Sequence, residues 1–188
     1  MYKKEQLAIF GVLLVAVIVS SLFYTAPTGM TDSTKVQGTV CAKYESLNGV
    51  IDLGCVHNTV TNIAKNVTRD YRMGRSMTGT NNTWATLMLT SGSTGPAATD
   101  TTCEATIFTT NGCGPTNGTT VASVDANVGN YSVTYKFQAT GACAAIAKVC
   151  LTNNTASTSP LMASALLSSA VTLAANENLT IVYYIGET

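Results

Sequence analysis

One stretch decides the fold of this chain: NYSVTYKFQA, residues 130–139. Its larger apolar side chains alternate with smaller or polar ones, at Tyr131, Val133, Tyr135 and Phe137. Successive side chains of a β-strand point to opposite faces. The alternation therefore predicts a strand that has one face in a core and the other in water.

Similar short runs recur from Val36 to the last residues, separated by clusters of Gly, Asn, Pro, Ser and Thr. This spacing is typical of an all-β fold, and we predict an antiparallel β-sandwich of Ig-like or jelly-roll-like type. The expected strands include residues 84–89, 144–151, 161–167 and 179–185. The run 161–167 also fits a short helix, because Ala and Leu are helix formers. The run 179–185 is apolar on both faces, which predicts a central strand or an interface.

The N-terminal residues 1–26 have the pattern of an export element. Lys3 and Lys4 precede an uncharged, mainly apolar run at residues 7–23. This run predicts a hydrophobic helix, either a cleaved signal peptide or a retained signal anchor. It is long for a signal peptide and slightly short for a transmembrane helix, so its length does not decide between them. Retention makes the membrane a partner of residues 7–23.

The topology and the domain organisation follow from that element. Lysines on the cytoplasmic side predict that residues 27–188 lie outside the cell. A type IV pilin leader is a poorer match, because Pro27 and Gly29 end the helix early. We expect an extended segment at 27–45 and a disulfide-bonded sandwich at 46–188.

All six cysteines lie beyond the export element: Cys41, Cys55, Cys103, Cys113, Cys143 and Cys150. An even number in an exported chain predicts three disulfides. Pairing between neighbours (41 with 55, 103 with 113, 143 with 150) would close short loops, although the sequence leaves the connectivity open. Metal binding is a weaker alternative: His57 lies near Cys55, but it is the only histidine and no Cys-x-x-Cys pair is present.

Potential N-linked glycan sites are spread over the exported part. Six positions satisfy the N-x-S/T rule: Asn66, Asn81, Asn117, Asn130, Asn153 and Asn178. Since the chain is rich in Asn, Ser and Thr, part of this number arises by chance. Their placement at predicted turns and strand ends is the stronger argument for glycans.

The composition excludes several function classes. Only 11% of the residues are charged and the formal net charge is zero. The one local cluster of basic residues is Arg69, Arg72 and Arg75, in a segment that reads as a solvated connection, so we expect no nucleic-acid partner.

No catalytic motif is evident, and we predict a protein that is not an enzyme and needs no cofactor. A single histidine argues against Ser-His-Asp and Cys-His catalysis. Asp100, Glu104 and Asp125 are the candidate carboxylates for glycoside chemistry, but no motif links them. The small-residue segment 91–103 is interpreted as a loop clipped by a disulfide, with a binding loop as the alternative.

Three stretches in order carry a resemblance: WATLMLTSGSTGPAATDTTCEATIF (84–108), NYSVTYKFQATGACAAIAKVCL (130–151) and SPLMASALLSSAVTLAANENLTIVYYIGET (159–188). Over residues 83–187 the chain resembles a β-sandwich module of phage tail-fibre-like proteins and of exported prokaryotic proteins, including archaeal ones. Six cysteines and an export element depart from a phage fibre assembled inside the cell.

Together with the export element and the Thr-rich surface, the chain resembles subunits of archaeal extracellular filaments, the pili or threads. That resemblance implies a homopolymer in which a donor strand enters the sheet of the next subunit. The candidate donor is segment 27–45, with Val36, Gly38 and Val40 on one face. An ordinary first strand of the same domain is an equal alternative.

The predicted function is therefore a structural subunit of a surface filament that assembles by strand exchange, with other copies of the chain and N-linked glycans as partners. The alternative is a membrane-anchored surface adhesin or virion glycoprotein. A type IV pilin-like subunit with a helical filament core is a more distant alternative.

Overall fold

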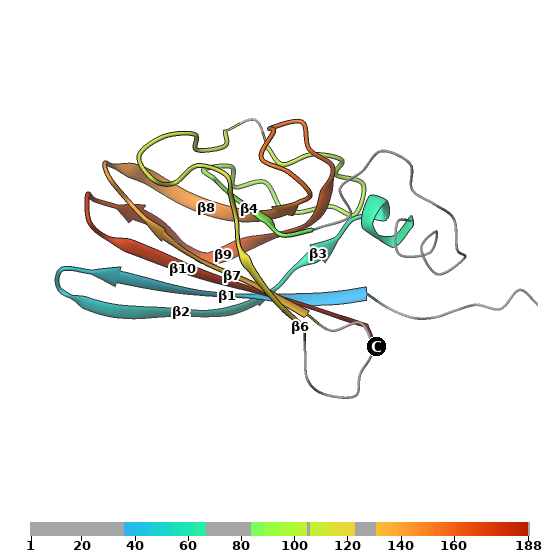
Figure 1. Cartoon of the computed structure of the whole chain (residues 1–188), viewed down its shortest axis with the longest axis horizontal. Helices are drawn as coiled ribbons and strands as arrows, with labels where there is room; N and C mark the ends of the chain where they lie inside the picture. The colour runs from blue at the N-terminus through green and yellow to red at the C-terminus, as the bar shows by residue number, and fades with distance from the viewer. Residues whose placement is uncertain (1–35, 67–83, 105, 123–130, 188) are drawn as a thin grey trace, which may run out of the picture. The chain divides into compact units, whose positions relative to one another are not determined.

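The computed structural model describes residues 36–66, 84–104, 106–122 and 131–187. Within these residues, ten strands form two five-stranded antiparallel sheets, shown in Figure 1. The first sheet has the order β2-β1-β10-β7-β6 and the second has the order β3-β9-β8-β4-β5. The predicted all-β class is confirmed. The hydrophobic helix expected at residues 7–23 lies outside the described residues.

The strands of the first sheet are β1 (Val36–Ser46), β2 (Gly49–His57), β6 (Thr119–Ala122), β7 (Tyr131–Gln138) and β10 (Asn178–Glu187). Those of the second sheet are β3 (Thr59–Val60), β4 (Thr86–Thr90), β5 (Thr116–Asn117), β8 (Cys143–Thr152) and β9 (Leu161–Leu173). A helical turn at 62–66 follows β3. Residues 161–167 are thus strand, and the helical alternative for them is wrong.

The core lies between the two sheets and is filled mainly by residues of β1, β4, β7, β8, β9 and β10. In β7, Val133 and Phe137 are fully buried, as the alternation predicted. In β10, which lies centrally between β1 and β7, Ile181 and Tyr183 are fully buried. Tyr184 on the other face of β10 is half exposed, so the first sheet presents its outer face to solvent.

The second sheet is covered on its outer face as well. All five residues of β4 are buried, which requires neighbours on both faces. The segment that follows β4 provides them: the Phe108 N–H donates to the Leu89 carbonyl (3.0 Å), and the Leu161 N–H donates to the Thr101 carbonyl (3.0 Å). A small second cluster lies beneath this segment, formed by Met88, Cys103, Cys150, Leu161 and Ile107.

Three disulfides join cysteines of the described residues: Cys41–Cys55, Cys103–Cys150 and Cys113–Cys143. The predicted number of bridges and the first pairing are confirmed. The other two neighbour pairings are wrong. Three intrachain disulfides are typical of proteins from oxidising, extracytoplasmic compartments.

The geometry of β8 explains why Cys143 and Cys150 are not bonded to each other. Cys143 and Cys150 lie in the same strand, seven positions apart, which corresponds to about 23 Å at the usual rise per residue. A disulfide needs Cα atoms within about 7 Å. The odd spacing also separates the two: Cys143 belongs to the main core with Cys113, whereas Cys150 packs with Cys103 in the outer cluster.

Candidate functional site

The first strand is the element that sequence reasoning singled out for assembly. β1 lies between β2 and β10 and pairs with β10 at ten successive positions, from Val36 opposite Glu187 to Glu45 opposite Asn178. Val40 is buried in the core, and Val36 and Gly38 are partly buried. The predicted donor residues thus belong to a strand of the chain's own sheet. Residues 27–35 of the predicted donor segment lie outside the described residues.

β1 and β2 form a tight hairpin, which we call the N-terminal hairpin (36–57). Ser46 and Gly49 face each other across a two-residue turn. The Ser46 hydroxyl donates to the Gly49 carbonyl (3.2 Å) and accepts the Asn48 N–H (3.1 Å). Gly49 has a positive φ of 133°, which only glycine adopts without strain. Cys41 lies directly opposite Cys55 and is bonded to it.

Side-chain contacts fix this hairpin to the rest of the chain. They are the Tyr44 hydroxyl with Glu177 Oε2 (2.7 Å), Lys136 Nζ with Glu45 Oε2 (2.5 Å), and the Ser168 hydroxyl with the Leu53 carbonyl (2.6 Å). The Ala174 N–H and the Tyr44 hydroxyl hold the pKa of Glu177 below its usual value. Lys136 likewise lowers the pKa of Glu45. Both contacts therefore weaken as pH falls far enough to protonate these carboxylates.

The closed end of the hairpin is apolar and exposed. Leu47, Val50 and Ile51 are 85%, 58% and 53% exposed. The turn that joins β1 to β2 is at the left of Figure 1. Exposed apolar groups of this kind are a feature of contact surfaces.

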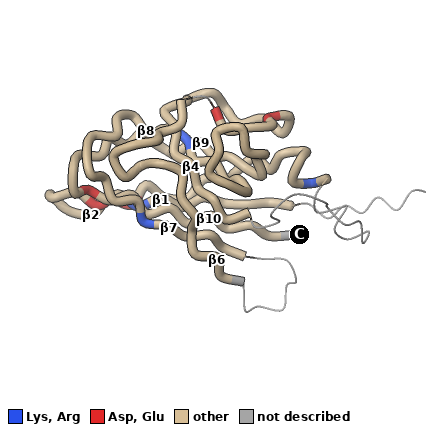
Figure 2. The backbone as a smooth tube through the Cα atoms, turned by 45° about the horizontal axis from the view of Figure 1, so that its top comes forward, with Lys and Arg blue, Asp and Glu red and all other residues tan. Residues whose placement is uncertain are grey.

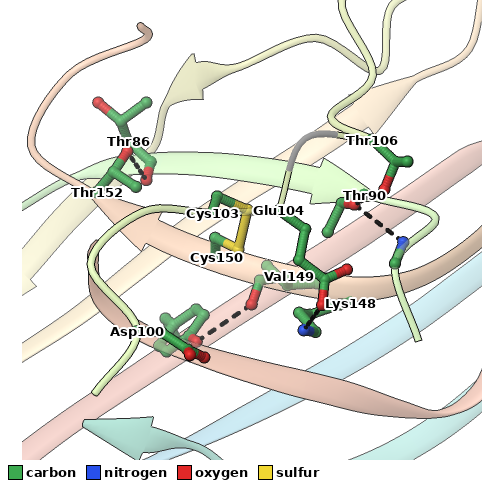
Figure 3. Close-up of a disulfide and its surroundings, with 12 residues drawn as sticks. Thr86, Thr90, Asp100, Cys103, Glu104, Thr106, Lys148, Val149, Cys150 and Thr152 are labelled. Atoms are coloured by element: carbon green, nitrogen blue, oxygen red, sulfur yellow. Dashed lines mark hydrogen bonds and ion pairs between the residues drawn. A yellow bond between two sulfur atoms is a disulfide. The ribbon is translucent and has the colours of Figure 1, made fainter. Parts of the chain in front are cut away.

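A second candidate site is a polar groove of about 390 Å³ on the outer face of the second sheet. It lies between β8, β9 and the segment that follows β4 (Figure 3). Its polar lining residues carry hydroxyls, two carboxylates and one amine: Thr94, Thr99, Asp100, Thr101, Thr102, Glu104, Lys148 and Ser164. Gly95, Leu161 and the Cys103–Cys150 bridge complete the lining. No aromatic side chain lines it, so it offers hydrogen bonds rather than a stacking surface.

The groove contains a buried charge that sequence reasoning missed. Lys148 is only 2% exposed and forms an ion pair and hydrogen bond with Glu104 (Figure 3). Glu104 fits there because position 92 is glycine: a Cβ on Gly92 would lie 1.1 Å from Glu104 Oε2. The signal in the sequence was the position of Lys148 inside the apolar run AAIAKVCL, which predicts a strand covered on both faces.

Removal of Glu104 tests whether the ion pair neutralises Lys148. We expect Glu104→Ala to lower the free energy of unfolding by about 2 kcal/mol, because it leaves a buried ammonium without its partner. The value is below that of a fully buried pair, since the Glu104 side chain is 28% exposed. Urea unfolding followed by circular dichroism measures it.

The matched control is Glu45→Ala, whose partner Lys136 is 52% exposed. Exposed pairs contribute little, so we expect a clearly smaller loss than for Glu104→Ala. Replacing both partners, with Glu104→Leu and Lys148→Met, should recover most of the stability. Equal losses for the two single variants would contradict the burial argument.

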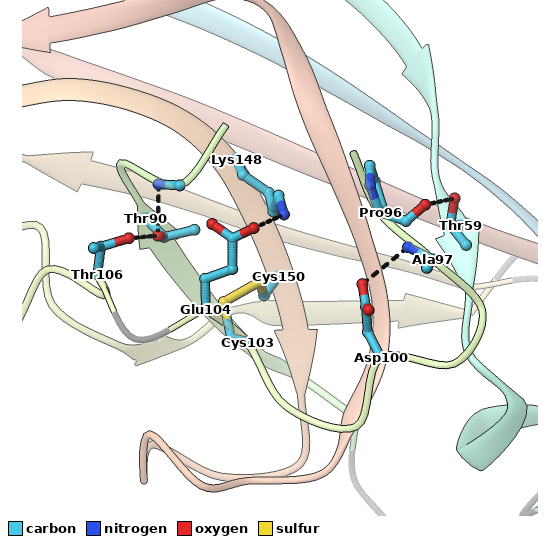
Figure 4. Close-up of polar contacts among 11 residues, drawn as sticks. Thr59, Thr90, Pro96, Ala97, Asp100, Cys103, Glu104, Thr106, Lys148 and Cys150 are labelled. Atoms are coloured by element: carbon cyan, nitrogen blue, oxygen red, sulfur yellow. Dashed lines mark hydrogen bonds and ion pairs between the residues drawn. A yellow bond between two sulfur atoms is a disulfide. The ribbon is translucent and has the colours of Figure 1, made fainter. Parts of the chain in front are cut away.

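Two of the three candidate carboxylates meet in the groove. Asp100 and Glu104 both line it, whereas Asp125 lies outside the described residues. Each has a structural partner: Asp100 Oδ2 accepts the Ala97 N–H (2.9 Å), and Glu104 holds Lys148 (Figure 4). The contacts of both acids are those of residues that shape the loop. That the chain is not an enzyme stays a prediction.

The other candidate residues lie apart from the groove. His57 is exposed at the end of β2, and the described residues contain no group of three metal-ligating side chains. The charged positions are few and scattered, as Figure 2 shows. Arg69, Arg72 and Arg75 lie outside the described residues. In the described part of the chain, no helix has the length and hydropathy needed to cross a membrane.

The predicted glycan sites differ in accessibility. Asn66 and Asn117 are exposed, Asn178 is half-buried in β10, and Asn153 is only 9% exposed. Thr86 donates to the oxygen of the Asn117 amide, not to the nitrogen that a glycan would occupy. Asn81 and Asn130 lie outside the described residues.

We therefore expect glycans at Asn66 and Asn117 and none at Asn153. Glycopeptide mass spectrometry of the protein produced in the secretory pathway of a host with N-glycosylation measures the occupancy of each site. The unglycosylated variants Asn66→Gln and Asn117→Gln serve as mass controls. Full occupancy at Asn153 would contradict the expected order.

The comparisons with known proteins add no identity. No family model matches the chain, and neither the curated proteins nor the solved structures contain a significant match.

Proposed function

We propose that this chain is a structural subunit of an extracellular surface filament, built on an Ig-like or jelly-roll-like sandwich and assembled by strand exchange between copies. The supporting observation is the position of β1. It is the first described strand, it follows the segment nearest the export element, and its removal would leave β10 with an open edge along ten positions. An equivalent strand from a second copy would restore the same hydrogen bonds and fill the place of Val40.

Other features of the chain fit this role. Head-to-tail exchange produces an open fibre, because each copy donates at one place and accepts at another. Three disulfides suit an exported protein. The scarcity of charge, 11% of residues, gives a surface that does not repel other copies of itself.

The experiment is negative-stain electron microscopy of material sheared from the surface of cells that make the full chain. Mass spectrometry then identifies the N-terminus of the protein in that material. Regular fibres that contain this chain, starting near residue 27, support the proposal. A membrane-bound chain that retains residues 7–23, without fibres, overturns it.

A membrane-anchored adhesin is the second candidate, and the polar groove is the observation that favours it. Hydroxyls and carboxylates around a groove of about 390 Å³ suit a small polar ligand. The same fractionation separates the two functions, because an adhesin stays with the membrane.

A further inference from the structure

The hairpin geometry restricts what can be exchanged. We propose that the exchanged unit is the whole disulfide-closed hairpin together with Asn58, residues 36–58, and not β1 alone. This inference rests on the proposed function, because it specifies the part of one subunit that a second copy of the chain receives.

Two links hold β1 to β2. The two-residue turn keeps Ser46 opposite Gly49, and the disulfide keeps Cys41 opposite Cys55. Because the turn is this short, β1 cannot pair with another subunit while β2 stays in its own subunit. The two strands are also joined at the end of the hairpin opposite the turn, where the Asn58 N–H donates to the Gly38 carbonyl (3.0 Å).

The hairpin is attached to the rest of the first sheet by a single ladder. Among the described strands β2 lies at the edge, so within this part of the chain the pairing of β1 with β10 is the only one that joins the hairpin to that sheet. The chain then enters β3, which pairs with β9 at only two positions. Transfer to a second copy therefore exchanges one ladder of ten positions for an identical one.

The end of the unit falls where little holds the chain. The side chain of Asn58 covers Gly38, and both of its polar atoms are buried without a hydrogen-bond partner. Attachment to the second sheet begins with the two pairs of β3 and β9 at Thr59 and Val60. It continues at Thr61, whose N–H donates to the Met162 carbonyl (2.9 Å) and whose hydroxyl donates to the Leu161 carbonyl (2.5 Å).

The two modes of exchange place the first disulfide differently. If β1 alone entered the next subunit, its Cys41 would face Cys55 of that subunit, and the bridge would join two chains. If the hairpin moves as one piece, Cys41–Cys55 stays within its own chain. In both modes Glu45 and Lys136 belong to different subunits, so their contact crosses between subunits and reports exchange itself.

Sheared fibres of the full chain provide the test. Free thiols are blocked with N-ethylmaleimide, and the fibres are boiled in SDS without reductant. We expect monomers. Fibres first treated with a carbodiimide, which converts the Glu45–Lys136 ion pair into an amide, should instead give a ladder of oligomers that resists reductant. The same treatment of Glu45→Gln fibres should give monomers, because that variant lacks the carboxylate.

Three results would contradict these expectations, and each overturns a different part of them. A ladder without carbodiimide that disappears with reductant, and in the double variant Cys41→Ala and Cys55→Ala, shows that β1 is exchanged alone. This overturns the hairpin unit and leaves the filament function standing. Fibres that yield only internally crosslinked monomers after carbodiimide overturn any exchange of β1. Absence of fibres overturns the proposed function and the inference with it.

Discussion

Replacing Cys103 and Cys150 together by alanine is expected to lower the free energy of unfolding by about 4 kcal/mol. The bridge spans 47 positions and ties the segment over the second sheet to β8. Its loss frees the longest of the three loops in the unfolded chain, where a crosslink restricts entropy most. Alanine leaves no unpaired polar group at two buried sites. Chemical unfolding followed by intrinsic fluorescence measures the change.

The Cys41–Cys55 bridge is the matched control. It spans 14 positions, and the double alanine variant should lose about 3 kcal/mol by the same relation. Cys55 is exposed, so the control removes little packing. A larger loss for the shorter loop would contradict the entropic account and would point to packing or native-state strain as the main contribution.

Phe137→Ala is expected to cost about 3 to 5 kcal/mol, the range for a large aromatic side chain removed from a core. Phe137 is fully buried in β7, and its ring lies edge-on against Tyr135 with centroids 4.9 Å apart. Thermal unfolding by differential scanning calorimetry measures the change, and the structure predicts that the variant folds less stably with the same strand content.

The control for that variant is Gln138→Ala on the same strand. Gln138 is exposed, so its truncation should change the stability by no more than about 0.5 kcal/mol. A comparable loss at both positions would show that β7 is not the core strand described above.

The strands that could be predicted from the sequence are those with an apolar face that is buried in the core. Phe137 falls in the alternating run 130–139 and Ile181 in the run 179–185, which is apolar on both faces, and both are core residues. The run at 161–167 was ambiguous because Ala and Leu can occur in a helix and in a strand. Tertiary pairing of β9 with β8 decides for strand.

The groove was less predictable. The segment after β4 is made of small polar residues, and nothing in its composition indicates that it folds back over a sheet. Its position depends on the Cys103–Cys150 bridge, and so on a pairing that sequence spacing alone leaves open. One part was accessible from the sequence: Cys150 lies in the predicted strand 144–151 and Cys143 directly precedes that strand. An extended segment of this length keeps the two cysteines too far apart to be bonded.

The register of β1 against β10 has a mechanical consequence. Val36 lies opposite Glu187, so these two residues are at the same end of neighbouring antiparallel strands. A tensile force applied between them loads one backbone pair at a time, so the pairs break one after another from that end. A force that slides β1 along β10 loads all ten pairs together. Single-molecule pulling between positions 36 and 187 should therefore open the first sheet at a lower force than pulling between positions 45 and 187.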